Sequence, residues 1–175
     1  MIRWILIKEI VIFDIDGILA DTSHRFEHFA HKCNCFFNIK NSYHEDQLLT
    51  LNYEYYKFFQ VRGYRIVIFT SRSEQYKYET RSWLRKNNIQ YETIEMRTKG
   101  DYRPAYLVKR DFLTNNFGLN PKTCVKAVFE DDIGCIQMYR SFGLKVYDCK
   151  RKTTPEITPK ITIEIQRTFR YSVYM

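Results

Sequence analysis

Short apolar runs rich in β-branched residues alternate with longer segments of helical periodicity between residues 10 and 147. Runs of this kind are typical of buried strands, and strands that alternate with helical segments are typical of βαβ units. Because each helix carries the chain back across the sheet, successive strands of such units run parallel. The alternation therefore predicts an α/β fold with a mostly parallel, five-stranded sheet between helices. The expected strands are residues 10–13, 64–69, 91–95, 125–129 and 145–147.

The helical segments are expected at residues 46–61, 74–87, 104–115 and 133–142, with a shorter helix at residues 24–32. Pro104 suits a first helical turn, because the backbone N–H groups of that turn lack helical partners in any case. In the first long segment four apolar residues fall near one face, as in an amphipathic helix. These residues are Leu48, Leu51, Tyr55 and Phe58.

The composition is that of a folded, basic domain. The chain has 175 residues, which is the length of one domain, and its 45% hydrophobic and 17% aromatic residues exclude a disordered chain. Lys and Arg number 28 and Asp and Glu number 20, so the net charge is +8. This charge favours polyanionic partners or anionic small substrates, without choosing between them.

The five cysteines are odd in number and lack the paired spacing of a zinc site or of a disulfide framework. The closest pair, Cys33 and Cys35, lies beside two histidines, but no second pair of metal ligands follows at zinc-finger spacing. We therefore expect reduced thiols at all five positions, which are Cys33, Cys35, Cys124, Cys135 and Cys149.

The two ends of the chain differ from its centre. The apolar N-terminal stretch is interrupted by Lys8 and Glu9, and no apolar run reaches the roughly 20 residues that span a bilayer. We therefore expect a soluble, cytoplasmic protein without membrane contact. After residue 149 a stretch rich in Thr, Pro and Lys predicts a linker, and apolar and polar residues then alternate as in a β-strand.

This C-terminal pattern fits a hairpin, or one long strand at a sheet edge or on a partner subunit. It makes residues 161–175 a candidate contact for a homo-oligomer. The expected organisation is one domain at residues 1–150, followed by a linker and an extra C-terminal β segment at residues 151–175.

Two carboxylates follow the first expected strand, in the sequence FDIDG. The C-terminal ends of parallel strands are where α/β sheets bind ligands. Asp14 and Asp16, followed by Gly17, can face one bound group, where one acid attacks, the other transfers a proton and a hard cation balances their charge. Asp-x-Asp-Gly also begins ordinary turns and calcium loops, but an EF-hand loop would need Glu where Arg25 stands.

Three further strand ends carry polar residues. Thr70 and Arg72 follow the second strand and suit a phosphate, although Ser and Thr are also common helix caps at such places. Three acids follow the fourth strand and support a metal site, because they cannot all stay ionised together without a cation; they are Glu130, Asp131 and Asp132. A basic segment follows the third strand, and a charge run of this kind is usually a solvated face. Its cations are Arg97, Lys99, Arg103, Lys109 and Arg110.

Taken in chain order, these motifs resemble the motif set of the haloacid dehalogenase (HAD) superfamily of phosphotransferases. The resemblance covers residues 10–148. Within the superfamily the chain is most similar to the 3′-phosphatase domain of polynucleotide kinase-phosphatases. The similar segments are FDIDGILADTSHR, GYRIVIFTSRSE, TRSWLRKNNIQYE, MRTKGDYRPAYLVKRDFL and FEDDIGCIQMYRSFGLKVY. The resemblance implies a Rossmann-like HAD core.

The resemblance also implies a catalytic role for each motif. Asp14 would take the phosphoryl group as an aspartyl-phosphate, and Asp16 would act first as general acid and then as general base. Thr70 would donate a hydrogen bond to a phosphoryl oxygen. Lys109 would hold the phosphate and the nucleophile together.

By the same resemblance, Mg²⁺ would bind the Asp14 carboxylate, the Asp16 main-chain carbonyl and the acid cluster. One register matches Glu130 and Asp131 to the acids of the family, and a shift by one residue matches Asp131 and Asp132, so Asp131 belongs to both. Three arginines would contact substrate phosphates, namely Arg72, Arg97 and Arg103.

HAD enzymes select substrates largely through cap domains, and this sequence leaves no room for a large one. Only residues 17–45 could cover the site. An open site admits the end of a polymer, so the first expectation is a magnesium-dependent phosphatase acting on 3′-phosphate ends of DNA or RNA.

The sequence contains no G-x-x-x-x-G-K-[ST] loop, the phosphate-binding motif that a kinase activity would need. The alternatives are a small-molecule HAD phosphatase such as a nucleotidase, and a non-catalytic nucleic-acid-binding or assembly protein.

Overall fold

The centre of the fold is a parallel sheet with β1 as its middle strand. The computed structural model describes residues 9–25 and 43–149. Five strands pair in the order β5-β4-β1-β6-β7, and each neighbouring pair is parallel. They are β1 (Ile10–Phe13), β4 (Arg65–Ser73), β5 (Thr93–Arg97), β6 (Val125–Glu130) and β7 (Val146–Asp148). The α/β fold with a five-stranded sheet, expected from the sequence, is confirmed.

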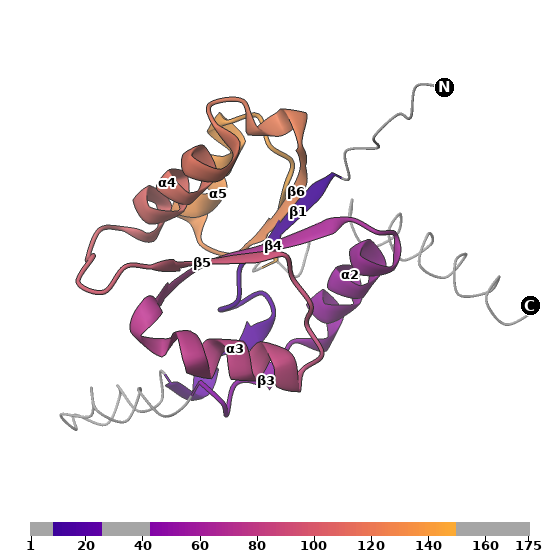
Figure 1. The fold of residues 1–175 in the computed structure, drawn as a ribbon, viewed down its shortest axis with the longest axis vertical. Coiled ribbons are helices and arrows are strands. Elements are labelled where there is room, and N and C mark those ends of the chain that lie inside the picture. The colour runs from indigo at the N-terminus through magenta and orange to yellow at the C-terminus, as the bar shows by residue number, and fades with distance from the viewer. Residues whose placement is uncertain (1–8, 26–42, 150–175) are drawn as a thin grey trace, which may run out of the picture.

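Helices cover both faces of this sheet (Figure 1). Helices α2 (Thr50–Val61) and α3 (Lys77–Lys86) lie on one face, and α4 (Ala105–Phe117) and α5 (Ile133–Ser141) lie on the other. All residues of β1 are buried, and they alternate between two hydrophobic clusters. Val11 and Phe13 pack in the cluster that contains Trp83 of α3. Ile10 and Ile12 pack in the cluster that contains Leu113 of α4, so a strand covered on both faces explains the continuous apolar run.

Helix α2 begins later than expected, and its first turn packs only in part. A short antiparallel pair of β2 (Ala20–Asp21) and β3 (Gln47–Leu48) takes up residues that the sequence assigns to the helix. Leu51, which helical spacing places near the same face as Tyr55 and Phe58, is 66% exposed. The first turn of α2 contributes no fully buried residue, and the helix packs mainly through its later turns. The buried residues are Tyr55, Tyr56, Phe58 and Phe59.

Strand β4 is longer than expected, and the extension matters for the site. It continues to Ser73, so that Thr70 and Arg72 lie within the strand instead of after it. Thr70 pairs with Met96 and Ser73 pairs with Arg97 of β5, with a register shift between the two pairs. The irregular end of β4 therefore carries polar residues along the C-terminal edge of the sheet.

No large cap is present among the described residues. Between Asp16 and Thr70, the described part contains the β2–β3 pair, helical residues 23–25, α2 and the start of β4. No helix of the described ranges is long and apolar enough to cross a membrane.

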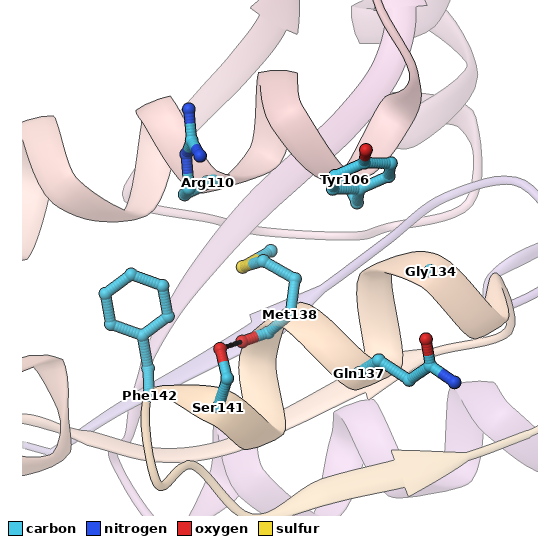
Figure 2. A pocket seen from close by; sticks show the side chains of 7 residues that line it. All are labelled: Tyr106, Arg110, Gly134, Gln137, Met138, Ser141 and Phe142. Carbon is cyan, nitrogen blue, oxygen red and sulfur yellow. Dashed lines mark hydrogen bonds between the residues drawn. The ribbon is translucent and has the colours of Figure 1, made fainter.

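A cavity of about 330 Å³ opens between α4 and α5 (Figure 2), with Tyr106 and Gly134 at one end and Arg110 and Phe142 at the other.

Several expectations fall wholly or largely outside the described residues. They concern most of the helix at residues 24–32, the pair Cys33 and Cys35, and the C-terminal segment 151–175 with its candidate contact at residues 161–175. Of the described cysteines, none forms a disulfide, as expected; they are Cys124, Cys135 and Cys149.

Candidate active site

A buried carboxylate stands directly at the end of the central strand. Asp14 follows β1 and is 6% exposed. Its backbone N–H donates to the carbonyl of Phe129 in β6 (3.1 Å), which continues the ladder of the sheet, and its Oδ1 accepts from the N–H of Ile15 (2.7 Å). The position and the direction of this carboxylate are therefore set by the sheet itself.

Lys109 of α4 joins two carboxylates from different strands. Its Nζ lies 2.7 Å from Asp14 Oδ2 and 2.7 Å from Glu130 Oε2, and the residue is 1% exposed. A cation at this depth is stable only with such partners. The expected pairing of Lys109 with Asp14 is thus present in the geometry, and Glu130 completes it.

The electrostatics of this group depend on burial and on the lysine. Burial raises the pKa of Asp14 to about 7, and the charges of Glu130 and Asp16 act in the same direction while Lys109 opposes them. Burial by itself would lower the pKa of Lys109, but the Asp14 and Glu130 carboxylates raise it well above its usual range. Lys109 therefore keeps its charge, and a further cation at the acids would favour ionised Asp14.

The acids at the end of β6 fall into two groups. Carboxylate oxygens of Asp14, Glu130 and Asp131 lie within 4.8 Å of one another, as ligands of one metal ion would. Asp132 instead caps α5, because its Oδ1 accepts from the N–H of Cys135 (2.8 Å). The geometry therefore favours the register with Glu130 and Asp131, and hard oxygen donors suit Mg²⁺.

Gly17 makes room for this acid cluster. Its φ is +74°, and a Cβ at this position would lie 2.2 Å from Asp131 Oδ2. Both the left-handed backbone and the missing side chain are thus needed where the chain passes the acids. This explains why glycine follows the Asp-x-Asp pair.

Asp16 lies beside two arginines. Its carboxylate accepts from Arg72 Nε (3.0 Å to Oδ1) and from Arg72 Nη2 (2.5 Å), and Arg25 Nη1 lies 3.5 Å away. Burial would raise the pKa of Asp16, but the Arg72 and Arg25 guanidinium groups outweigh it and hold the pKa below its usual range. Asp16 is therefore ionised in this arrangement.

Asp46 holds both arginines from the far side. It accepts from Arg72 Nη2 (2.7 Å) and from Arg25 Nε (2.9 Å), and its side chain is fully buried. The guanidinium carbons of Arg25 and Arg72 lie 4.2 Å and 4.6 Å from the centre of the Tyr43 ring. Trp83 Nε1 donates to the Asp46 carbonyl (2.7 Å), which anchors this segment to α3.

One atom of this network lacks a partner. Arg72 is 3% exposed, and its Nη1 is buried with no hydrogen-bond partner among the described atoms. Thr70 is also buried, and its Oγ1 accepts from the Arg72 N–H (3.2 Å). A hydroxyl and an unsatisfied guanidinium nitrogen thus occur within one short stretch of β4.

The other two predicted phosphate contacts lie in the β5–α4 loop. Arg97 donates through Nε to the Ser71 carbonyl (3.0 Å) and through Nη1 to the carbonyls of Asp101 and Arg103. Arg103 pairs with Asp101 and with Asp111 (2.8 Å each). Both guanidinium groups are engaged within the protein, and their contact with a substrate stays a prediction.

Comparison with known families agrees with this geometry. The sequence profile of the polynucleotide kinase PNKP phosphatase domain matches residues 8–153, which is most of the chain. The chain belongs to this family. It is therefore a phosphatase domain of the HAD superfamily, as the sequence motifs indicated. No curated protein matches the chain.

Solved structures share the fold of this PNKP-type domain at low sequence identity. A chain of the Pnkp1/Rnl/Hen1 RNA repair complex is 22% identical, with a TM-score of 0.66 over 81% of this chain and 42% of that one. A hydrolase from Streptococcus pneumoniae TIGR4 is 15% identical (TM-score 0.54), over 91% of this chain and 100% of its own. A HAD family enzyme from Bacteroides thetaiotaomicron, in complex with magnesium and inorganic phosphate, is 10% identical (TM-score 0.54), over 87% and 100%.

This PNKP-type domain thus spans less than half of the repair-complex chain.

Sequence reasoning did not single out Arg25, Tyr43 or Asp46 as part of the candidate active site. They come from the connection between the first two motifs, and their contacts cross 21 to 37 positions of sequence. Arg25 ends the similar segment FDIDGILADTSHR, which is the signal that could have marked it. The burial of Arg25 and Asp46 is not visible in the sequence.

Replacing Asp46 with asparagine is expected to weaken both the fold and the catalytic site. The amide keeps the shape but leaves two buried guanidinium groups with one counter-charge fewer. We expect the free energy of unfolding to fall by about 2 kcal/mol, the typical worth of a charged hydrogen bond. Urea unfolding measures this loss of stability.

The control is Glu92→Gln. Glu92 pairs with Arg65 at the surface, so losing this ion pair should cost less than about 1 kcal/mol. Equal losses in the two variants would contradict the importance assigned to Asp46.

Proposed function

We propose that the protein is a magnesium-dependent phosphomonoesterase that removes phosphate from 3′-phosphorylated ends of polynucleotides through an aspartyl-phosphate. The observation that carries the proposal is the buried Asp14, bridged to Lys109 beside the acid cluster. Membership of the PNKP phosphatase-domain family gives the reaction class. The substrate is the further step proposed here.

In the first half-reaction an Asp14 carboxylate oxygen attacks phosphorus, and the P–O bond to the leaving group breaks. Lys109, Thr70 and Arg72 Nη1 donate to the phosphoryl oxygens and stabilise the charge that develops on them. The Thr70 oxygen already accepts from the backbone, which leaves its proton for this donation. The product of the step is an aspartyl-phosphate and a free hydroxyl end.

Asp16 transfers the protons. The bound phosphate brings negative charge next to Arg72 and Asp16, which favours uptake of a proton from solvent by the Asp16 carboxylate. Asp16 then gives this proton to the leaving oxygen. In the second half-reaction Asp16 takes a proton from water, and this water attacks the phosphorus of the aspartyl-phosphate. The P–O bond to Asp14 then breaks and inorganic phosphate leaves.

The metal would be held by Asp14, Asp131 and the main-chain carbonyl of Asp16, with Glu130 at the edge of the cluster. Glu130 Oε1 already accepts from the N–H groups of Asp131 and Asp132 (3.1 Å each), and Oε2 accepts from Lys109. Glu130 therefore serves mainly to orient the loop and the lysine. When bound, Mg²⁺ supplies charge that offsets the repulsion between the nucleophile and the phosphate.

A polymer end fits this site better than a small enclosed substrate. Among the described residues no large cap closes over Asp14, and the net charge of +8 attracts a polyanion. The structural neighbour in the Pnkp1/Rnl/Hen1 complex belongs to an RNA repair assembly. These three features support a nucleic-acid end as substrate.

A phosphate-release assay tests the proposal. With magnesium, the protein should release phosphate from a 3′-phosphorylated oligonucleotide with a kcat/KM at least about tenfold above that for a 5′-phosphorylated oligonucleotide or any mononucleotide. Chelation of the metal should abolish the release. Preference for a mononucleotide would indicate a small-molecule phosphatase. Absence of turnover on every substrate, an aryl phosphate included, would favour a binding or assembly protein.

A further inference from the structure

The loop between β5 and α4, residues 98–104, forms one wall of a second cavity. This cavity has a volume of about 410 Å³, and Ser73 at the end of β4 and Gln75 in the 3-10 turn after it also line it. Figure 1 shows the loop projecting beyond the end of β5, at the edge of the sheet where the strands end. The reaction derived above gives this cavity no task.

Hydrogen bonds to and from the backbone hold the loop in place. The Arg97 guanidinium donates to three main-chain carbonyls, two of them within or at the end of the loop. The Lys99 N–H donates to Glu74 Oε1 (3.1 Å), and the Arg103 N–H donates to Asp101 Oδ1 (3.0 Å). The loop is thus ordered before any ligand binds, which lowers the entropic cost of binding.

This ordered loop displays an aromatic ring and a cation. Tyr102 is 95% exposed, and Lys99 is exposed beside it. Gly100, with φ +85°, has no atom within 4 Å of the place where a Cβ would stand, so the space next to the loop is open. An exposed aromatic ring with a neighbouring cation is the combination that binds single-stranded nucleic acid, through base stacking and phosphate contact.

The cavity lies near the catalytic groups without overlapping them. Ser73 pairs with Arg97, while Thr70, three residues earlier in β4, pairs with Met96. Three residues of strand span at most about 10 Å, and the register shift shortens the distance here, because Met96 and Arg97 are neighbours. A strand whose terminal phosphate lies at Thr70 can therefore continue along this edge toward the cavity.

We propose that residues 98–104 form a subsite for the nucleotides that precede the phosphorylated end, with a base stacked on Tyr102 and a backbone phosphate on Lys99. This inference rests on the proposed function and adds a site for the polymer. Arg97 and Arg103 are the positioning residues of this subsite, because they hold the loop that carries Tyr102.

Binding and turnover together test the subsite. Removing the ring in Tyr102→Ala should raise the Kd for a fluorescent single-stranded oligonucleotide with a 3′-hydroxyl end roughly tenfold, while Tyr102→Trp should bind about as well as the wild type. Lys99→Ala should lower the slope of log Kd against log salt by about 0.7, the value for one phosphate contact on a single strand. On the 3′-phosphorylated oligonucleotide, Tyr102→Ala should raise KM and leave kcat unchanged.

The matched control is Tyr78→Ala, which removes another exposed tyrosine, 83% exposed on α3. It should leave both the Kd and the KM unchanged, and hydrolysis of an aryl phosphate should be the same in all variants. An unaltered Kd in Tyr102→Ala, or no binding by the wild type, overturns the subsite. Oligonucleotide binding that depends on Tyr102 without any release of 3′-phosphate would support the subsite and overturn the proposed substrate instead.

Discussion

The Lys109→Met variant is expected to lose about 3–5 kcal/mol of unfolding free energy and all measurable phosphatase activity. Methionine fills a similar volume, but Asp14 and Glu130 would then be buried beside each other without the cation that lies 2.7 Å from both. Removing one partner of a buried ion pair typically costs this much, because the remaining charge stays desolvated. Urea unfolding gives the stability, and the aryl phosphate assay gives the activity.

The loss should also depend on pH. In the wild type burial raises the pKa of Asp14 to about 7 against the opposing charge of Lys109. Without Lys109 the pKa of Asp14 in the folded variant lies higher still, above that in the unfolded chain, so the folded state binds more protons. Stability then falls as pH rises, and the deficit of the variant should be larger at pH 8 than at pH 6.

The double variant Lys109→Met, Glu130→Gln is the control for this explanation. It removes one of the two unpaired charges, so it should recover part of the lost stability while remaining inactive. A Lys109→Met protein as stable as the wild type, or a double variant less stable than Lys109→Met alone, would contradict the ion-pair account.

The Asp14→Asn variant is expected to fold and to lose at least about 10³-fold in kcat, because an amide cannot form the phosphoryl intermediate. Phosphate assays under saturating substrate and magnesium measure this loss. Wild-type protein denatured during turnover should also retain phosphate on the peptide that contains Asp14, and the variant should not.

Asp132→Asn is the matched control, since it makes the same chemical change at a neighbouring strand end. Asp132 caps α5, and asparagine is an equally good cap, so activity and stability should change little. Full activity in Asp14→Asn would exclude the aspartyl-phosphate. Loss of activity in Asp132→Asn would instead place the metal ligands one residue further along the chain.

Much of this arrangement could be predicted because parallel strands bring their C-terminal ends to one edge. The apolar runs around Val11 and Val128 indicated strands, and residues just after such strands meet in space wherever they lie in the chain. This is why Asp14 and Asp131, which are far apart in sequence, could be assigned to one candidate site. The same argument could not tell whether Glu130 or Asp132 joins Asp131 in the cluster, since one position of register decides which acid caps the helix.

The β2–β3 pair, the exposure of Leu51 and the network around Asp46 could not be predicted. Helical periodicity placed Leu51 on the apolar face, but whether a turn packs depends on what lies opposite it, and the first turn of α2 contributes no fully buried residue. Arg25 and Asp46 look like ordinary surface charges in the sequence. Their burial depends on Tyr43 and Trp83, which approach them only in the folded chain.

The sequence by itself determined the α/β fold, the family and the edge of the sheet at which Asp14, Lys109 and Asp131 meet. These follow from local patterns, namely hydrophobic periodicity and short motifs at strand ends, which short-range sterics and burial translate into structure. Only the tertiary structure decided which side chains pair with which. Asp16 with Arg72, Arg72 with Asp46, and Lys109 with Glu130 are contacts between distant segments. Their strength comes from the removal of water by the surrounding core, a property that no local segment possesses.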